Sequence, residues 1–255
     1  DALHDQNAFH FNPLAYSRGL VDAIRQLGSQ VFEETIVESI KGARGSWQIV
    51  SPRGTVSARD VVVATGGYTG RLLPVLHRSY LPIATYVMLT EANPELVASA
   101  VKTHSAILDD RRASDYYRVV DEGRRLLWGG RITTRTSEPR ALSRLLHKSM
   151  VSTYPQLKEL QVDMAWSGAM SYARHRMPQI GQLLSGLWYC TAFGGHGMST
   201  TAIGGTVVAE AILQTSDRYR HFAPFGLEYT GGLVGRAAVQ ATYWQYQLMD
   251  AWRER

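Results

Sequence analysis

The sequence predicts an α/β fold interrupted by a mostly β section, and three observations lead to this prediction. Two continuous apolar runs, residues 60–65 and 186–192, have the composition of strands buried on both faces, and a glycine-rich turn follows each of them. Between these runs, residues 81–131 consist mainly of alternating or β-branched segments. Helical patterns lie near both ends of the chain.

The predicted elements begin with a helix after a polar N-terminal stretch. Asn12 is a favourable N-cap residue, and Pro13 has the fixed φ angle that suits the first helical position. An apolar stripe at helical spacing follows and ends before Gly28; it comprises Leu14, Leu20, Val21, Ile24 and Leu27. Strand-like segments separated by turns come next, at residues 30–34, 36–41, 47–51 and 55–57.

In the second half of the chain, the sequence pattern predicts a similar alternation of helices and strands. Residues 138–153 carry apolar side chains at helical spacing, and the pattern ends before Tyr154 and Pro155. Strand-like sequence follows at 161–171 and in the buried run at 186–192, which leads into a helix ending near Leu213. The C-terminal segment predicts a closing amphipathic helix.

Composition and charge exclude several classes of protein. The 255 residues are 45% hydrophobic and 19% charged, which is typical of one or two globular domains and not of a disordered or coiled-coil chain. The apolar runs are too short for a membrane-spanning helix, and the polar start lacks the order of a secretory signal. The single cysteine, Cys190, cannot form an internal disulfide, which favours a reducing, cytoplasmic setting. The net charge of +5 is scattered, so we expect no nucleic-acid partner.

The two glycine-rich turns are the segments most suited to binding a ligand. Gly194–Gly197 follows a buried strand and precedes a helix, whose N-terminus would offer N–H groups and partial positive charge to an anion. The turn at 64–67 follows the other buried strand. Loops at the carboxyl ends of parallel strands line the ligand crevice of open α/β sheets. The alternative interpretation is that the glycines serve tight packing alone.

These segments resemble a known family. The order EETIVES, DVVVATGGY, β-rich insertion, MPQIG and GLWYCTAFGGHGMS is similar to that of flavin-dependent amine and amino-acid oxidoreductases of the D-amino-acid oxidase superfamily. WSGAMSYARHRMPQIG and GGLVGRAAVQATYWQYQL are most similar to its gamma-glutamylputrescine oxidoreductase branch. The resemblance covers the whole chain and implies a partial FAD-binding, Rossmann-like domain with an inserted antiparallel substrate sheet. The implied domains are 1–79 and 166–255 for FAD, and 80–165 for substrate.

The resemblance also implies where noncovalent FAD binds. Val37 matches a residue whose backbone contacts the adenine side, and the turn at 64–67 matches a strand end beside the cofactor. The second turn matches a loop under the flavin's pyrimidine edge, where N–H groups and the helix dipole would stabilise negative charge. The implied cofactor residues are Val37, Ala64, Thr65, Gly66, Gly67, Gly194, Gly195, His196, Gly197, Met198 and Ser199. His196 is also the one catalytic candidate, as a general base, although such loops act through the main chain.

The reaction implied by the family is hydride transfer from the carbon beside an amine to flavin N5, which leaves an imine for water to hydrolyse. The substrate would be a small amine or amino acid, with oxygen or a quinone as electron acceptor. The candidate substrate contacts are Tyr116, Tyr117, Arg131 and Trp166, because arginine can bind a carboxylate and aromatic rings can surround an alkylamine. Each of the four can instead be a packing or surface residue. No metal-ligand spacing occurs, so we expect no metal site.

Several departures from the family pattern bear on cofactor and acceptor. No GxGxxG turn for the ADP half of FAD occurs in the 255 residues, so we expect a missing N-terminal segment, a partner chain that supplies it, or weakened FAD binding. Ser199 and Leu127 stand where relatives carry lysines for small carboxylates and for oxygen. Three hypotheses follow: an amine oxidoreductase, a non-catalytic or partner-dependent subunit or fragment of one, and an unrelated α/β ligand-binding protein.

Overall fold

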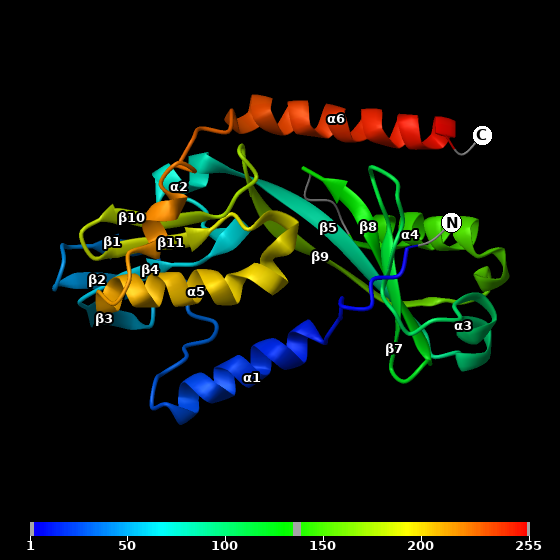
Figure 1. Ribbon diagram of the computed structural model, residues 1–255, viewed down its shortest axis with the longest axis horizontal. Coiled ribbons are helices and arrows are strands. Elements are labelled where there is room, and N and C mark those ends of the chain that lie inside the picture. The colour runs from blue at the N-terminus through cyan, green and yellow to red at the C-terminus, as the bar shows by residue number, and fades with distance from the viewer. Residues whose placement is uncertain (1–2, 135–138, 254–255) are drawn as a thin grey trace. The chain divides into compact units, whose positions relative to one another are not determined.

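The computed structural model describes residues 3–134 and 139–253 and divides them between two compact units (Figure 1). Unit 1 comprises Asp1–Phe11, Ile83–Ala169 and Arg236–Arg255, and unit 2 comprises Asn12–Pro82 and Met170–Gly235. The mixed α/β architecture with antiparallel sheets that the sequence predicts is confirmed. The three-segment domain division stays a prediction. No helix in the described part of the chain is long and apolar enough to cross a membrane.

Unit 2 contains two three-stranded sheets. The first is an antiparallel meander of β1 (Ser39–Lys41), β2 (Trp47–Ser51) and β3 (Gly54–Ala58). In the second sheet, β11 (Leu187–Thr191) lies between β10 (Gln179–Leu184), which is antiparallel to it, and β4 (Val61–Val63), which is parallel to it. The helices of this unit are α1 (Pro13–Gln26), α2 (Pro74–Ser79) and α5 (Gly197–Leu213).

The second sheet is the packing centre of unit 2. On one side, Trp47 from the meander and Leu76 from α2 pack with Val63 and Leu187. In another cluster, the α5 residues Val207, Val208 and Ala211 pack with Ile180, Trp188 and Cys190. Strand β11 contributes to both clusters, so its apolar run is buried on both faces, as the sequence predicts. Strand β4 contributes only to the first cluster, and Val62 is 42% exposed, so the prediction that this run is buried on both faces is wrong.

Unit 1 is built on a five-stranded sheet with the order β6-β7-β8-β5-β9. Its strands are β5 (Tyr80–Thr90), β6 (Ile107–Leu108), β7 (Tyr116–Val120), β8 (Arg125–Thr133) and β9 (Val162–Ala173). The ends of β5 and β9 belong to unit 2. The helices are α3 (Pro94–Ala100), α4 (Pro139–Thr153) and α6 (Gly232–Arg253).

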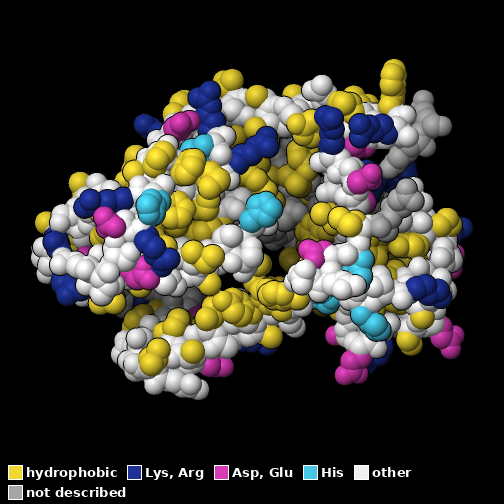
Figure 2. Space-filling model, viewed as in Figure 1, with side chains coloured by type: hydrophobic (Ala, Val, Ile, Leu, Met, Phe, Trp, Pro, Cys, Tyr) yellow, Lys and Arg dark blue, Asp and Glu magenta, His cyan; other side chains and the backbone are white. Residues whose placement is uncertain are grey.

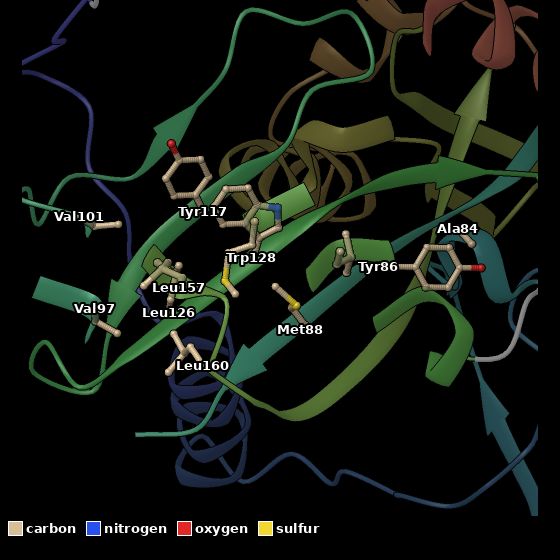
Figure 3. Close-up of a cluster of buried hydrophobic side chains, with 12 residues drawn as sticks. Ala84, Tyr86, Met88, Val97, Val101, Tyr117, Leu126, Trp128, Leu157 and Leu160 are labelled. Atoms are coloured by element: carbon tan, nitrogen blue, oxygen red, sulfur yellow. The ribbon is translucent and has the colours of Figure 1, made fainter. Parts of the chain in front are cut away.

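The core of unit 1 lies between one face of this sheet and α3 and α4 (Figure 3). Trp128 is fully buried, and the Tyr117 ring stacks on it with ring centroids 4.0 Å apart. The Tyr117 hydroxyl is 3.0 Å from the Tyr154 hydroxyl, and the Tyr154 ring meets both aromatic rings edge-on. Leu146 and Met150 of α4 complete the core with no exposed surface.

Helix α6 is bonded to the rest of unit 1 through polar side chains. The buried Gln240 Oε1 accepts the Thr134 N–H at 2.9 Å and the Thr133 hydroxyl at 2.8 Å. The buried Asp250 carboxylate accepts the N–H groups of Arg112 and Ala113. The large apolar residues of α6 point outward instead; the exposed ones are Leu233, Val234, Trp244, Leu248, Met249 and Trp252. Figure 2 shows yellow side chains along the upper edge, where Figure 1 places α6.

Some local predictions are wrong. Residues 30–34 form no strand, and of 36–41 only Ser39–Lys41 is a strand. Helix α3 lies within residues 81–131, which were expected to be mainly strands, and α2 lies in a segment for which the sequence made no prediction; both begin with proline in the first turn. In α3 the Asn93 side chain accepts the Leu96 N–H, a capping bond that overrides the local strand propensity. Glu138, expected in α4, lies outside the described residues.

Helix α1 forms at the expected place but does not bury its apolar stripe. Asn12 caps it by accepting the N–H groups of Leu14 and Ala15. None of its residues is buried, and the exposed apolar side chains include Leu14, Leu20 and Ile24.

Candidate functional site

The parallel pairing of β4 and β11 brings together the two glycine-rich turns that the sequence singles out. Val61 is paired with Leu187 and Val63 with Tyr189, so both strands end at the same edge of the sheet. The first turn follows β4 directly, and the second follows β11 and leads into α5 (Figure 1). Segments far apart in the sequence therefore become neighbours at the carboxyl ends of parallel strands, where open α/β sheets bind ligands.

The first turn is held by its own hydroxyl groups. Thr69 is buried, and its hydroxyl donates to the Gly66 carbonyl at 3.1 Å. The Thr65 hydroxyl lies 2.6 Å from that of Thr69 and is therefore the donor between the two, since the Thr69 proton is already used. Gly66 has a φ of 53°, in the left-handed region that favours glycine. Ala64 and Thr65 are exposed, which leaves this turn accessible to a ligand.

The second turn leaves β11 through a strained residue. Ala192 is buried and has a φ of 58°, a left-handed conformation that costs a non-glycine residue about 1–3 kcal/mol and is typical of functional sites. Gly194 has a φ of 59°. No side chain caps the start of α5, and the hydroxyls of Ser199 and Thr200 both donate to the His196 carbonyl. An uncapped helix start at the end of a strand is suited to negative charge.

The remaining predicted residues of this turn are accessible. Gly195, His196, Met198 and Ser199 are exposed, and Gly197 is half-buried. Within the described part of the chain, no group bonds to the His196 ring. Catalysis by this imidazole therefore stays a prediction.

Val37 lies just before β1 and is half-buried. The adjacent Glu38 N–H donates to the Val50 carbonyl and continues the pairing of the meander. A contact between Val37 and the cofactor stays a prediction.

Sequence reasoning missed Tyr172, which lies against the second turn. A Cβ atom placed on Gly195 would be 2.9 Å from the Tyr172 hydroxyl oxygen. Tyr172 comes from β9, and its residue neighbours carry no glycine-rich signal, so only pairing in three dimensions reveals it.

In unit 1, Tyr116 and Tyr117 take opposite faces of the sheet. Tyr117 belongs to the core, stacked on Trp128, so we remove it from the candidate substrate contacts. Tyr116 is 38% exposed on the face away from α3 and α4, and its ring lies over Gly129, its partner on β8. A Cβ at Gly129 would be 2.2 Å from Tyr116 Cζ, so glycine is required there. The Tyr116 hydroxyl is 3.4 Å from that of Thr85 on β5.

Arg131 sits in a β-bulge of β8. Ala84 pairs with Thr133 and Tyr86 with Gly130, so Arg131 and Ile132 together oppose the single residue Thr85. Arg131 has a left-handed φ of 54°, and bulges of this kind redirect side chains beside functional sites. No described residue bonds to the half-buried Arg131 guanidinium. The bulge thus places Arg131 beside Thr85, the residue that the Tyr116 hydroxyl approaches.

Trp166 lies on β9 and is 42% exposed. The preceding Ala165 packs against the core, whereas the Trp166 side chain is accessible. Three of the four predicted substrate residues therefore remain available to a ligand.

Unit 2 also holds the one cysteine, and its surroundings are apolar. Cys190 is buried among Ile180, Trp188 and Val207, and burial raises the pKa of its thiol to about 11. Among residues 3–134 and 139–253, no group of three or more His, Cys, Asp or Glu side chains is arranged to hold a metal ion.

A comparison with protein families identifies the family of the chain that carries these two turns. Residues 1–211 match the family described as DAO, FAD dependent oxidoreductase. The chain belongs to this family. FAD is the family's cofactor, and its members are oxidoreductases. The expected family and cofactor are thus confirmed at the level of the family.

Two curated relatives match nearly the whole chain. It is 32% identical over 255 residues to gamma-glutamylputrescine oxidoreductase of Escherichia coli strain K12, and 28% identical over 258 residues to a probable oxidoreductase, OrdL, of Haemophilus influenzae. Each match covers 98% of this chain and 59% of the relative. This family member therefore spans about three-fifths of the length of these relatives.

Solved structures support the same fold. Glycine oxidase from Geobacillus kaustophilus is similar with a TM-score of 0.69 at 22% identity, over 83% of this chain and 56% of that one. L-proline dehydrogenase from P. horikoshii gives a TM-score of 0.67 at 17% identity, over 85% and 61%. At these identities the likeness concerns the fold alone.

Proposed function

We propose that this family member is the flavin-facing and substrate-binding part of an oxidoreductase that oxidises the C–N bond of a primary or secondary amine or amino acid. The observation that carries the proposal is the pairing of β4 with β11, which puts both glycine-rich turns at one sheet edge beside the uncapped start of α5. Two similar proteins, gamma-glutamylputrescine oxidoreductase and glycine oxidase, are named for substrates of this kind. A cytoplasmic setting is part of the proposal.

The residues of unit 2 fit a noncovalent flavin. Gly195 is exposed, and the start of α5 offers positive potential with no side chain capping it. Gly66 and Gly67 would border the cofactor from the β4 side, with Thr65 and Ala64 exposed beside them. When bound, FAD would be the acceptor of a hydride from the carbon beside the substrate nitrogen. These residues of the chain would hold it and stabilise negative charge.

In unit 1, Arg131 is the residue proposed to bind a substrate carboxylate. Its guanidinium can donate two parallel hydrogen bonds to a carboxylate without first breaking an ion pair with a described residue. Tyr116 and Trp166 would surround the alkyl part of the amine and exclude water from it. Their work is orientation, which this chemistry needs more than a dedicated acid or base.

The test is a visible absorption spectrum of the purified protein with FAD, followed by anaerobic titration with amines and amino acids. We expect flavin bands that bleach with substrate. In Arg131→Gln the half-saturating concentration of a carboxylate-bearing substrate should rise by about tenfold or more, because a hydrogen bond between charged groups is lost. Arg124→Gln, an exposed arginine that precedes β8, should leave that concentration unchanged.

A second candidate is a form that needs another segment or chain to bind FAD. Two observations support this candidate: the matched relatives are longer, and no GxGxxG turn occurs in the sequence. Protein that stays colourless with FAD, but acquires flavin bands when a polypeptide with a dinucleotide-binding turn is added, would support this candidate. Protein that stays colourless in both cases would refute both proposals.

A further inference from the structure

The outer face of α6 carries a continuous stripe of uncharged side chains. Residues separated by alternating steps of four and three stay on one side of a helix, because seven residues make nearly two turns. The α6 residues at such steps are all exposed, and we call them the seam: Val234, Ala238, Ala241, Gln245, Leu248 and Trp252. All but the glutamine are apolar, which is the composition of an interface and not of a solvated helix face.

The opposite side of α6 is bonded to the rest of unit 1. The Gln240 Oε1 accepts the Thr134 N–H, and the Asp250 carboxylate accepts the Ala113 N–H. The Arg236 guanidinium donates to the Thr134 carbonyl at 2.5 Å. Because these bonds fix the rotation of the helix about its own axis, the seam cannot turn inward. Its burial therefore requires contact with another molecular surface.

The two halves of the seam have complementary shapes. The C-terminal half carries the larger side chains Leu248 and Trp252, and the N-terminal half carries the smaller Val234, Ala238 and Ala241. The larger side chains border a hollow of about 520 Å³, which is lined by Gln245, Leu248, Met249, Trp252 and Arg253. Two identical helices that run antiparallel bring the small half of one against the hollowed half of the other.

An antiparallel pair of α6 helices would place a small side chain opposite a larger one in its outer layers. With a two-fold axis at the middle of the seam, Leu248 of one copy faces Ala238 of the second copy. Trp252 in the same way faces Val234 of the second copy. Each layer occurs twice, because the axis relates the two copies.

A parallel pair fits less well, because it would place every residue opposite itself. Trp252 would then meet Trp252, and Ala238 would meet Ala238, so that no single distance between the helices fills both layers. In the antiparallel pair the one polar seam residue, Gln245, faces Ala241, whose small side chain leaves the amide in contact with water. Shape therefore favours the antiparallel arrangement.

The exposed apolar area of α6 is sufficient for a stable dimer. The exposed fractions of Leu233, Val234, Leu248, Met249 and Trp252 correspond to about three and a half whole side chains, or about 700 Å² per copy at about 200 Å² for each large side chain. A specific interface of standard size buries about 800 Å² per partner. The seam and its flanks come close to that area.

We propose that the seam is a dimer interface, in which the α6 helices of two copies of this protein pack antiparallel about a two-fold axis. Such a contact uses the same surface on both copies, so it closes on itself and stops at two. It involves none of the residues proposed to bind flavin or substrate. The inference therefore goes beyond the proposed function and does not depend on it.

The first experiment exchanges the two side chains of one layer and measures the dimer dissociation constant by sedimentation. Leu248→Ala puts alanine opposite alanine and should raise this constant by about tenfold or more. Adding Ala238→Leu again pairs a leucine with an alanine and should return the constant to within about threefold of the wild type. Adding Ala251→Leu instead puts the leucine at an exposed position beside the seam and should not restore it.

Four results would overturn the proposal. They are a wild type that stays monomeric at micromolar concentrations, a dimer that Leu248→Ala does not weaken, a failure of Ala238→Leu to rescue it, and equal rescue by Ala251→Leu. A monomer that sediments with phosphatidylglycerol vesicles, and loses this binding in Leu248→Ala, would assign the stripe to a membrane surface instead. Circular dichroism of each variant checks that the fold is retained.

The second experiment measures the orientation of the two helices. A spin label is attached to Arg253→Cys, while the buried Cys190 should stay unlabelled. The label lies about ten residues from the axis, so at 1.5 Å per residue the two labels of an antiparallel dimer should be about 30 Å apart. In a parallel dimer they should be within about 20 Å, since packed helices lie 8–10 Å apart. Electron–electron double resonance gives the distance, and a short one would overturn the antiparallel arrangement.

Neither experiment requires FAD or substrate. A protein that dimerises as described but binds no flavin would support this inference and contradict the proposed function. A monomeric protein that binds flavin and is reduced by an amine would do the reverse.

Discussion

At the scale of single residues, Cys190 illustrates how burial decides chemistry. The thiol is 8% exposed, belongs to an apolar cluster between β11 and α5, and has a pKa raised by burial from its ordinary 9.0 to about 11. At neutral pH almost no reactive thiolate is present. Cys190 is therefore a packing side chain, as the sequence predicts for a cysteine inside a buried strand.

The raised pKa of Cys190 predicts a pH dependence of stability. Between pH 9 and 11 the unfolded chain loses the thiol proton while the folded chain keeps it, so the free energy of unfolding falls as pH rises. The contribution is on the order of 2 kcal/mol over this range. Urea unfolding of the wild type and of Cys190→Ala at pH 8 to 11 should show the steeper fall in the wild type. Parallel curves would contradict the prediction.

Neighbouring tyrosines show what a residue's type alone does not reveal. Tyr116 and Tyr117 are residues of the same type, yet Tyr117 stacks in the core and Tyr116 covers Gly129 on the open face. Strand alternation predicts that they face opposite ways, but the side that α3 and α4 cover follows only from packing.

At the scale of elements, α5 is shaped by how closely it approaches β11. A Cβ at Gly204 would lie 2.6 Å from Phe193 Cζ and 3.0 Å from Cys190 Sγ, whereas one at Gly205 would meet nothing within 4 Å. Close packing thus requires glycine at one of these two adjacent helix positions but not at the other. Gly204 allows close contact with the strand, and Gly205 is an exposed helix position.

This difference predicts opposite effects of the same substitution. Gly205→Ala should stabilise the protein by about 0.5–1 kcal/mol, because alanine has the higher helix propensity. Gly204→Ala should destabilise it by about 1 kcal/mol or more, because Phe193 must move to admit the methyl group. Urea unfolding of the two variants at pH 7 gives both values. Effects of the same sign in both would show that contact with Phe193 does not matter.

At the scale of the whole molecule, α6 buries two polar side chains and exposes several large apolar ones. Gln240 and Asp250 are buried and hydrogen-bonded, while Leu248 and Trp252 are 69% and 82% exposed. Helix α1 also exposes apolar side chains (Figure 2). Such exposed apolar surface favours self-association of the protein in solution.

We therefore predict that Leu248→Gln combined with Trp252→Gln reduces both self-association and the binding of a hydrophobic dye. The change should leave the free energy of unfolding within about 0.5 kcal/mol, because neither side chain is buried. Dye fluorescence and analytical ultracentrifugation are the measurements. Gln245→Ala, at another exposed position of α6, is the control and should change neither. Undiminished association in the double variant would mean that another surface is responsible.

The sequence by itself determined the class of fold, most helices and strands, and the two turns of the candidate cofactor site. These features depend on local chemistry: Asn12 and Pro13 start α1, apolar runs form β4 and β11, and glycines permit the turns that follow. The motifs also identified the family, which the match over residues 1–211 confirms.

Only the tertiary structure decided which of these parts meet. The pairing of β4 with β11, the bulge that presents Arg131 and the contact of Tyr172 with Gly195 all join segments distant in the sequence. Local patterns encode φ and ψ preferences and a buried face, but not the partner on that face. The partner is selected by packing and by the need of buried polar groups for hydrogen bonds, which are properties of the folded chain.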